Sequence, residues 1–321
     1  MATTPTDAPL ATDDTPDAEP PPTASSDIKT ALGMATPATI GLVLFVIVPF
    51  GLAIWLSFQN LKLNSARPAE FFGFEQYRRV LLDPDFRGDF YAGLRNNLLF
   101  AAVVVPLQTS LAVLLALVLN RKLRGMAFYR TFIFMPIVFP MALVAVMWRL
   151  IYSRSETGML NAALDFVTFG QVGPIDWLGS SSWALISIII LSMWQGVGFQ
   201  TIIVLAGLQG ISPTLYEAAS IDKASTVRQF RHVTLPGLRN TLIFVVMVTT
   251  IFSFRLFDQV YILTKGGPDN STTTLMYQAV DNAFVKNNVG RGAAITVLLF
   301  LMVVLITIVQ RRFLKEERAI S

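Results

Sequence analysis

The stretch Glu217-Ala218-Ala219-Ser220-Ile221-Asp222-Lys223-Ala224 lies between two long apolar runs, near residues 183–209 and 240–264. It belongs to a polar, helix-prone segment, 212–236, which is too short to form a domain of its own. Each flanking run is long enough to cross about 30 Å of hydrocarbon, which takes roughly 20 helical residues. The segment is therefore predicted to be a loop that joins two membrane spans.

The composition is typical of a chain that lies mostly inside a membrane. Hydrophobic residues make up 53% of its 321 residues and charged residues only 14%, whereas a soluble domain carries about 25% charged residues. Helices satisfy their own backbone hydrogen bonds in lipid over such continuous apolar runs. We therefore expect an all-α, polytopic integral membrane protein with six transmembrane helices, near 35–58, 95–119, 128–152, 183–209, 240–264 and 292–312.

One membrane domain, 31–315, is expected between two tails. Residues 1–30 are rich in Pro, Thr, Ala and Asp and cannot bury a core, so they predict a disordered cytoplasmic N-terminal tail. Residues 316–321 are expected to form a cytoplasmic C-terminal tail. The apolar patch 159–172 is broken by polar residues, and it predicts an interfacial helix outside the membrane.

Basic residues set the predicted orientation, because positively charged loops stay in the cytoplasm. They cluster after the second span, in the segment 212–239 and at the end of the chain, whereas the third and fifth loops carry far fewer for their length. Both termini and the segment 212–236 are therefore expected in the cytoplasm. The first loop does not follow this pattern, because it would place several basic residues outside the cell, with acidic residues interspersed among them. Longer loops obey the positive-inside rule weakly.

The residue types that several chemistries require are missing. The chain has no cysteine, and His232 is its only histidine, so disulfides and thiol catalysis are excluded and no catalytic group or metal site is expected. There is no glycine-rich phosphate loop with Lys-Ser/Thr, so we expect ATP to bind a separate subunit. Basic residues in short loops indicate membrane orientation and contact with lipid, not a nucleic-acid surface.

The segment 212–236 predicts a helix–turn–helix. Ser212-Pro213 is a good helix start, because serine can cap and proline at the first helical position loses no needed N–H. Thr226 with Gln229 fits a capping box for a second short helix. Leu235-Pro236 is expected to end that helix before the next span begins.

This segment resembles the EAA signature of permease subunits in binding-protein-dependent ABC importers. In that family the loop forms coupling helices that sit in a cleft of the ATP-hydrolysing subunit. Lys223 stands where the family usually has glycine, which suits a turn with a left-handed backbone. The resemblance implies that coupling to the ATPase is carried by Glu217, Ala218, Ala219, Asp222, Lys223, Ala224 and Phe230.

The resemblance covers roughly residues 35–315. Within the family, the chain is similar to the carbohydrate-type permeases, in particular to the maltose/glycerol-3-phosphate-type first permease subunit. It rests on Tyr129-Arg130-Thr131 through Pro136, Trp194 through Phe199, Phe257-Asp258 and Gly266-Gly267-Pro268. It implies half of a translocation path for a sugar or sugar derivative in the inner membrane of a prokaryote. The implied partners are a second homologous permease in a heterodimer, two ATP-binding subunits or domains that carry ATP and Mg, and an extracytoplasmic solute-binding protein.

Polar and aromatic side chains at membrane depth indicate the path, because rings stack on sugar C–H faces and amides read hydroxyl groups. Arg255 and Asp258 are three residues apart and could pair with each other. We interpret them as a structural intramembrane pair in preference to a ligand contact. Asn96 and Asn97, near the end of a span, add amides or simply face water. The candidate path residues are Gln195, Gln200, Phe254, Phe257, Asp258 and Tyr261.

Two other functions stay open from the residues alone. A self-contained secondary transporter or channel would often show repeated halves or a series of ionisable residues along its path, and neither is clear here. An ABC permease for a non-sugar solute would share the loop but match the fifth span less well. A membrane enzyme is a third possibility, but the sequence offers no credible catalytic group for it.

Overall fold

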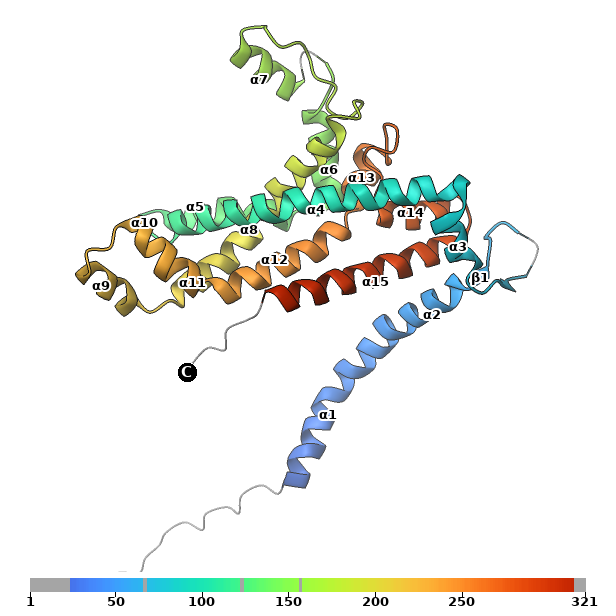
Figure 1. The fold of residues 1–321 in the computed structure, drawn as a ribbon, viewed down its shortest axis with the longest axis horizontal. Helices are drawn as coiled ribbons and strands as arrows, with labels where there is room; N and C mark the ends of the chain where they lie inside the picture. Colours follow the sequence, from blue (N-terminus) through green and yellow to red (C-terminus); the bar gives the residue numbers. More distant parts are fainter. Residues whose placement is uncertain (1–23, 66–67, 122–123, 156–157, 315–321) are drawn as a thin grey trace, which may run out of the picture. The chain divides into compact units, whose positions relative to one another are not determined.

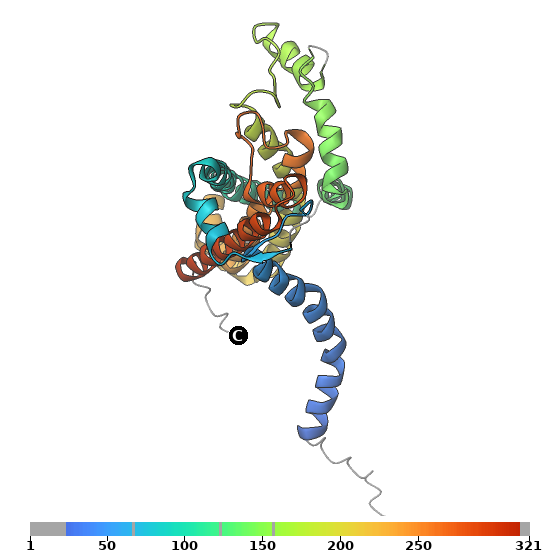
Figure 2. The same cartoon turned by 90° about the vertical axis from the view of Figure 1, so that its right-hand side faces the viewer.

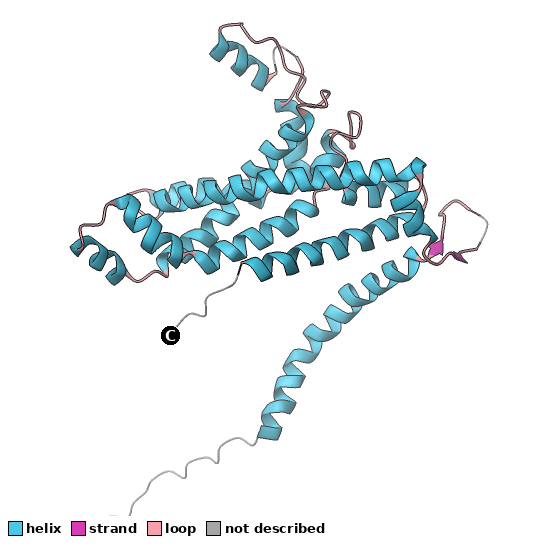
Figure 3. Ribbon diagram, viewed as in Figure 1, coloured by secondary structure: helices cyan, strands magenta, loops and turns pink. Residues whose placement is uncertain are grey.

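A computed structural model of the chain describes residues 24–65, 68–121, 124–155 and 158–314. Most of these residues are helical, and loops and two very short strands join the helices (Figure 3). The chain divides into two compact units, Met1–Gly51 and Leu52–Ser321. The C-terminal tail expected over 316–321 lies outside the described residues.

The first unit contains the beginning of the first span. The helical segments are α1 Ala24–Leu42, the π-helix η1 Val43–Ile47 and α2 Val48–Ser57, the last of which continues into the second unit. Residues Thr30–Ser57 are long and apolar enough to cross a membrane. The helix starts at Ala24, so the prediction of disorder over 1–30 is wrong from that residue onward, while residues 1–23 lie outside the described part.

The second unit is a bundle whose long helices lie side by side (Figures 1 and 2). They bury three apolar clusters between them, built on residues such as Ile188, Leu238 and Leu275, which are all fully buried. The long helices are α4 Pro84–Leu119, α8 Ala184–Gln209, α12 Arg239–Phe254 and α15 Val289–Phe313.

Helix α4 starts well before the predicted position near 95. Asp83 caps it by accepting a hydrogen bond from the backbone N–H of Asp85 at 3.0 Å, and Pro84 occupies the first helical position. Its 36 residues span roughly 54 Å, which exceeds the hydrocarbon thickness of about 30 Å. The helix therefore continues well beyond the membrane core, where apolar periodicity could not reveal it.

The third predicted span, 128–152, is broken. It consists of α5 Met126–Val138 and α6 Met141–Ile151, which are bent by 98°. The cause lies in Phe139-Pro140, because a residue before proline is driven out of the helical region, and Phe139 has φ −77° and ψ 137°. The third crossing is thus two helices, and α6 turns away from the bundle in both Figure 1 and Figure 2.

The fifth span is also interrupted. Helix α12 ends at Phe254, and α13 runs Asp258–Leu263. Side chains from other elements bind carbonyls freed at the break: Asn97 donates to the carbonyl of Ser253 at 3.2 Å, and Thr274 Oγ1 donates to that of Leu256 at 2.8 Å. Asn97 also accepts from the N–H of Leu275, at the start of α14 Leu275–Val280, at 3.0 Å. Asn96 and Asn97 are therefore buried structural residues, 1% and 0% exposed, and the expectation that they face water is wrong.

The short elements gather mainly at the end of the bundle opposite the 212–236 loop (Figure 1). Among them, the helix α3 Glu75–Leu82 carries an ion pair in which Arg78 contacts Glu75 at 2.6 Å. The side-chain hydrogen bond from Arg78 lowers the pKa of Glu75 to about 2, so this carboxylate stays ionised at physiological pH. These elements are β1 Gln59–Asn60, β2 Glu70–Phe71, which pairs antiparallel with it, α3 Glu75–Leu82, α14 Leu275–Val280 and the π-helix η3 Asp281–Val285.

The patch 159–172 contains a helix, α7 Met159–Thr168, as expected, and its interfacial position stays a prediction. Its buried Asn161 fixes the surrounding loop, because its amide nitrogen donates to the carbonyl of Ile175 at 3.1 Å and its oxygen accepts from the indole N–H of Trp177 at 2.9 Å. The opposite side of the helix exposes Phe166 and Val167. Polar residues therefore interrupt the apolar patch because they organise the loop.

Candidate functional site

The predicted helix–turn–helix is present at one end of the bundle. It consists of α9 Pro213–Ile221, α10 Thr226–Gln229, the π-helix η2 Phe230–Thr234 and α11 Leu235–Gly237. Two details differ from the sequence prediction. The second helix is capped by Ser225, which accepts from the N–H of Arg228 at 3.4 Å, and not by Thr226. Leu235-Pro236 does not end the helix, since Pro236 lies in the first turn of α11, where no N–H is required.

The turn after α9 has the geometry of a Schellman motif. The N–H of Ala224 donates to the carbonyl of Ala219 at 2.9 Å, and the N–H of Lys223 donates to the carbonyl of Ser220 at 3.0 Å. Lys223 has φ +53°, in the left-handed region that favours glycine. The turn therefore keeps a glycine-type backbone although a lysine occupies it.

Replacing Lys223 by glycine is expected to stabilise this turn. The substitution relieves the left-handed strain of a residue with a Cβ, which is worth about 1 kcal/mol, or roughly 5-fold in the local opening equilibrium. Hydrogen exchange of the amides of residues 219–224 should slow by that factor. Lys223→Ala removes the same charge but keeps the Cβ, so slowed exchange in that variant as well would show that charge, not backbone strain, matters.

The coupling residues named from the sequence fall into two groups. Glu217, Ala218, Asp222 and Lys223 are exposed, whereas Ala219, Ala224 and Phe230 are half-buried. The ring of Phe230 packs against the apolar cluster that joins α4, α8 and α12. Two further side-chain contacts tie the first helix to the second, Tyr216 Oη to Thr234 Oγ1 at 3.0 Å and Gln229 Nε2 to Ser220 Oγ at 3.2 Å. The loop thus combines an open surface with a rigid attachment to the bundle.

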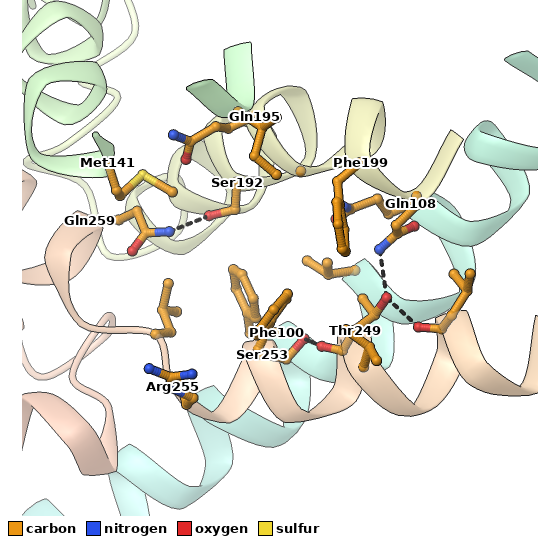
Figure 4. A pocket seen from close by; sticks show the side chains of 18 of the residues that line it. Phe100, Gln108, Met141, Ser192, Gln195, Phe199, Thr249, Ser253, Arg255 and Gln259 are labelled. Atoms are coloured by element: carbon orange, nitrogen blue, oxygen red, sulfur yellow. Dashed lines mark hydrogen bonds between the residues drawn. The ribbon is translucent and has the colours of Figure 1, made fainter. Parts of the chain in front are cut away.

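A cavity of about 420 Å³ lies between the two broken helices, within reach of both breaks (Figure 4). The α5–α6 break contributes Phe139 and Met141, and the α12–α13 break contributes Arg255 and Asp258. Interrupted helices that face a cavity are typical of solute sites in transporters, since irregular backbone at membrane depth is tolerated where it lines one. Its other walls come from α4, α8 and α12, through Phe100, Val104, Gln108, Ser192, Gln195, Gly196, Phe199, Gln200, Val245, Val248, Thr249, Phe252 and Ser253.

Neutral amides form the polar part of the cavity. The side-chain nitrogen of Gln195 donates to the carbonyl of Phe139 at 3.0 Å, so it satisfies a group freed by the break before Pro140. That of Gln200 donates to Thr249 Oγ1 at 2.5 Å. That of Gln259 donates to Ser192 Oγ at 3.3 Å (Figure 4). Among the described residues the Gln200 Oε1 is buried and has no hydrogen-bond partner.

The structure brings together only half of the predicted path residues. Gln195, Gln200 and Asp258 line the cavity. Phe254 does not, because it is 1% exposed and packs in the apolar cluster with Leu275. Phe257 and Tyr261 also lie outside the lining and stack on each other, with ring centroids 5.4 Å apart.

Two further expectations about this region have clear outcomes. The Arg255–Asp258 ion pair is not formed, since no salt bridge joins these two among the described residues. Sequence reasoning overlooked the cavity rings Phe139, Phe199 and Phe252. Phe139 could have been found, because the proline that follows it predicts a break and therefore a side chain turned off the helix.

Comparison with known proteins identifies the family. Residues 108–318 match the model of the binding-protein-dependent transport system inner membrane component. The chain is 35% identical over 277 residues to the trehalose/maltose transport system permease protein MalF of Thermococcus litoralis, covering 86% of this chain and 90% of the relative. It is 31% identical over 287 residues to the sulfoquinovosyl glycerol transport system permease protein SmoG of Agrobacterium fabrum, covering 89% and 91%.

A solved structure shares the fold. A chain of a bacterial ABC transporter involved in the import of the acidic polysaccharide alginate superposes with a TM-score of 0.75 at 19% identity, covering 91% of this chain and 98% of that one. In the described part of the chain, five helices are long and apolar enough to cross a membrane, or six if the bent pair α5–α6 counts as one span. The chain belongs to the family of binding-protein-dependent transport system inner membrane components, the permease subunits of ABC importers.

Proposed function

We propose that this chain is one permease subunit of an importer for a sugar or sugar derivative, and that it forms half of the translocation path. The observation that carries the proposal is the exposed helix–turn–helix α9–α10, which is attached to the bundle core through Phe230. The sugar class is supported by the names of two relatives, which transport trehalose/maltose and sulfoquinovosyl glycerol. It is also supported by a cavity that combines aromatic rings with neutral amides.

The helix–turn–helix is the proposed docking surface for the ATP-hydrolysing subunit, which would carry ATP and Mg. Glu217 offers an exposed carboxylate for charge-assisted hydrogen bonds. Ile221 and Val227 are 81% and 76% exposed, and such apolar side chains at the tip of a loop are stabilised by burial in a partner. Movement of this surface would then pass through Phe230 to the helices that line the cavity.

The proposed transport mechanism is alternating access. ATP-driven closure of two nucleotide-binding subunits would move the loop, and the bundle would open to the other side of the membrane. A second, homologous permease would supply the other half of the path, in a heterodimer. A solute-binding protein would dock on the opposite end of the bundle, where α3 and α14 lie, and release its ligand into the cavity.

The proposed location is the inner membrane of a prokaryote, with both termini in the cytoplasm. Basic residues in the docking loop and near the C-terminus, such as Arg228, Arg231 and Arg312, support this arrangement. Cysteine accessibility tests it: a thiol introduced at Ser220 should react only with permeant reagents in intact cells, and labelling by an impermeant reagent would overturn the orientation.

Copurification and ATPase measurements test the function itself. The tagged chain should bring down an ATPase and a second permease, and the reconstituted complex should hydrolyse ATP faster when a loaded binding protein is added. A panel of trehalose, maltose, sulfoquinovosyl glycerol, amino acids and sulfate identifies the solute class. Stimulation only by an amino acid or by sulfate would replace the sugar assignment, and purification without any ATPase would remove the importer mechanism.

Phe230→Ala is expected to weaken coupling while docking persists. The ring is half-buried against the α4–α8–α12 cluster, so its loss removes about 1–2 kcal/mol of apolar contact between the loop and the bundle. Stimulation of ATPase activity by the loaded binding protein should fall about 10-fold, while copurification of the ATPase is unchanged. Val227→Ala, on the exposed face of the loop, serves as the control with the reverse expectation. It should weaken docking of the ATPase and leave the contact between the loop and the bundle intact.

A further inference from the structure

Arg255 is a cation whose position the coupling mechanism does not explain. It follows the last residue of α12, lies within the apolar candidate span Arg239–Leu263, and its side chain lines the cavity (Figure 4). Among the described residues no salt bridge reaches its guanidinium, including from Asp258, which lines the same cavity. Ionised side chains at membrane depth usually face a partner charge or a ligand path, because an unpaired charge there is costly.

Apart from Arg255 and Asp258, the polar groups of the cavity are neutral amides and hydroxyls. The amide nitrogens of Gln195, Gln200 and Gln259 each donate one bond to a protein oxygen, and neutral amides of this kind can exchange further hydrogen bonds with sugar hydroxyls. Asp258 adds a carboxylate, which only accepts when ionised. This set suits the hydroxyl donors of a sugar, whereas the five N–H donors of Arg255 require a strong acceptor. Sugar hydroxyl and ring oxygens are weak acceptors compared with an anionic group.

We propose that the cavity takes a carbohydrate with an anionic substituent, a carboxylate, sulfonate or phosphate, and that Arg255 holds this group. The proposal rests on the proposed function, in that the cavity is the solute path of a sugar importer. A planar guanidinium matches such oxyanions with two parallel hydrogen bonds, which a lysine cannot reproduce. Asp258, three residues further on, would repel the anion and accept from sugar hydroxyls, so it orients the ligand with its charged end at Arg255.

The relatives do not decide between neutral and anionic sugars, since the trehalose/maltose and sulfoquinovosyl glycerol permeases match this chain to similar degrees. The distinction therefore depends on the guanidinium in the cavity.

Two matched pairs of probes test the charge preference. Glucosyl glycerol differs from sulfoquinovosyl glycerol, and trehalose from trehalose 6-phosphate, essentially by the anionic group. Binding of each radiolabelled probe to the purified importer complex, without binding protein, is measured by equilibrium dialysis. We expect at least one anionic member to bind about 10-fold more tightly than its neutral partner, which corresponds to about 1.4 kcal/mol.

Variants assign that preference to Arg255. Arg255→Gln should abolish the 10-fold difference, and Arg255→Lys should keep a smaller part of it. Lys265→Gln removes one positive charge from an exposed residue outside the cavity lining, so it should leave the difference unchanged. Equal binding of both members by the wild-type complex overturns the proposal, and so does an Arg255→Gln variant that weakens neutral and anionic probes alike.

Two other outcomes have distinct meanings. If Arg255→Gln prevents copurification of the second permease, the guanidinium pairs with that subunit and the anion site is wrong. If the wild-type complex shows no charge preference but its ATPase is still stimulated by a loaded binding protein, the anion proposal fails while the importer function stands. Absence of any associated ATPase instead overturns the function on which the proposal rests.

Discussion

Glu217→Arg is expected to abolish transport while the protein still inserts into the membrane. Glu217 is exposed on α9, where its carboxylate is available to a partner, and the substitution puts a positive charge into the proposed docking cleft. Reversing one partner of a desolvated charge contact costs roughly 2–5 kcal/mol. Affinity for the ATP-hydrolysing subunit should therefore fall about 100-fold, and transport should drop to background in proteoliposomes.

Matched variants separate docking from general charge effects. Asp165→Arg makes the same change of net charge on the exposed face of α7 and should transport normally. Glu217→Gln keeps the shape and loses the charge, so it should retain part of the affinity. Normal coupled transport by Glu217→Arg would show that Glu217 has no role in coupling, even though the family assignment is unaffected.

Gly198→Ala is expected to have the second largest effect, on stability. A methyl group at this position of α8 would collide with the carbonyl oxygen of Ile133 and lie 3.1 Å from the Cα of Phe134, both in the backbone of α5. Backbone atoms cannot move aside as a side chain would, so the two helices must separate at a cost of about 3 kcal/mol. The midpoint of thermal unfolding should fall by roughly 5–10 °C.

A second glycine of the same helix provides the control. Gly210, at the end of α8, has φ −80°, and an added methyl would meet its nearest neighbour at 3.5 Å, an ordinary contact. Gly210→Ala should therefore change the unfolding midpoint by less than about 2 °C. Equal stability of the two variants would show that α5 and α8 do not approach as closely as the structure places them.

Much of the architecture was predictable because lipid allows few solutions. Continuous apolar runs predicted the positions of α8 and α15 to within a few residues. The helix–turn–helix was predictable from Ser212-Pro213 and from its resemblance to a known family, which has now been confirmed. The family glycine even indicated the left-handed turn that Lys223 adopts.

The breaks and the cavity were less accessible to sequence reasoning. Hydropathy averages over a span, so it could not separate α5 from α6 or α12 from α13, although Pro140 carried a local signal. Asn97 looked like a solvated residue near a span's end, because its partners are more than 150 residues away in sequence. Phe254 could not be distinguished from Phe252 by residue type, although only the latter faces the cavity.

The length of α4 has a mechanical consequence. Near one end, Ala116 and Leu119 share the apolar cluster against which Phe230 packs, and toward the other, Asn96 and Asn97 hold the loop before α14. A single helix therefore connects the end of the bundle that carries the 212–236 loop with the region around α14. A tilt of this helix at one end would displace its other end, so in the proposed transport cycle both openings of the path would change together.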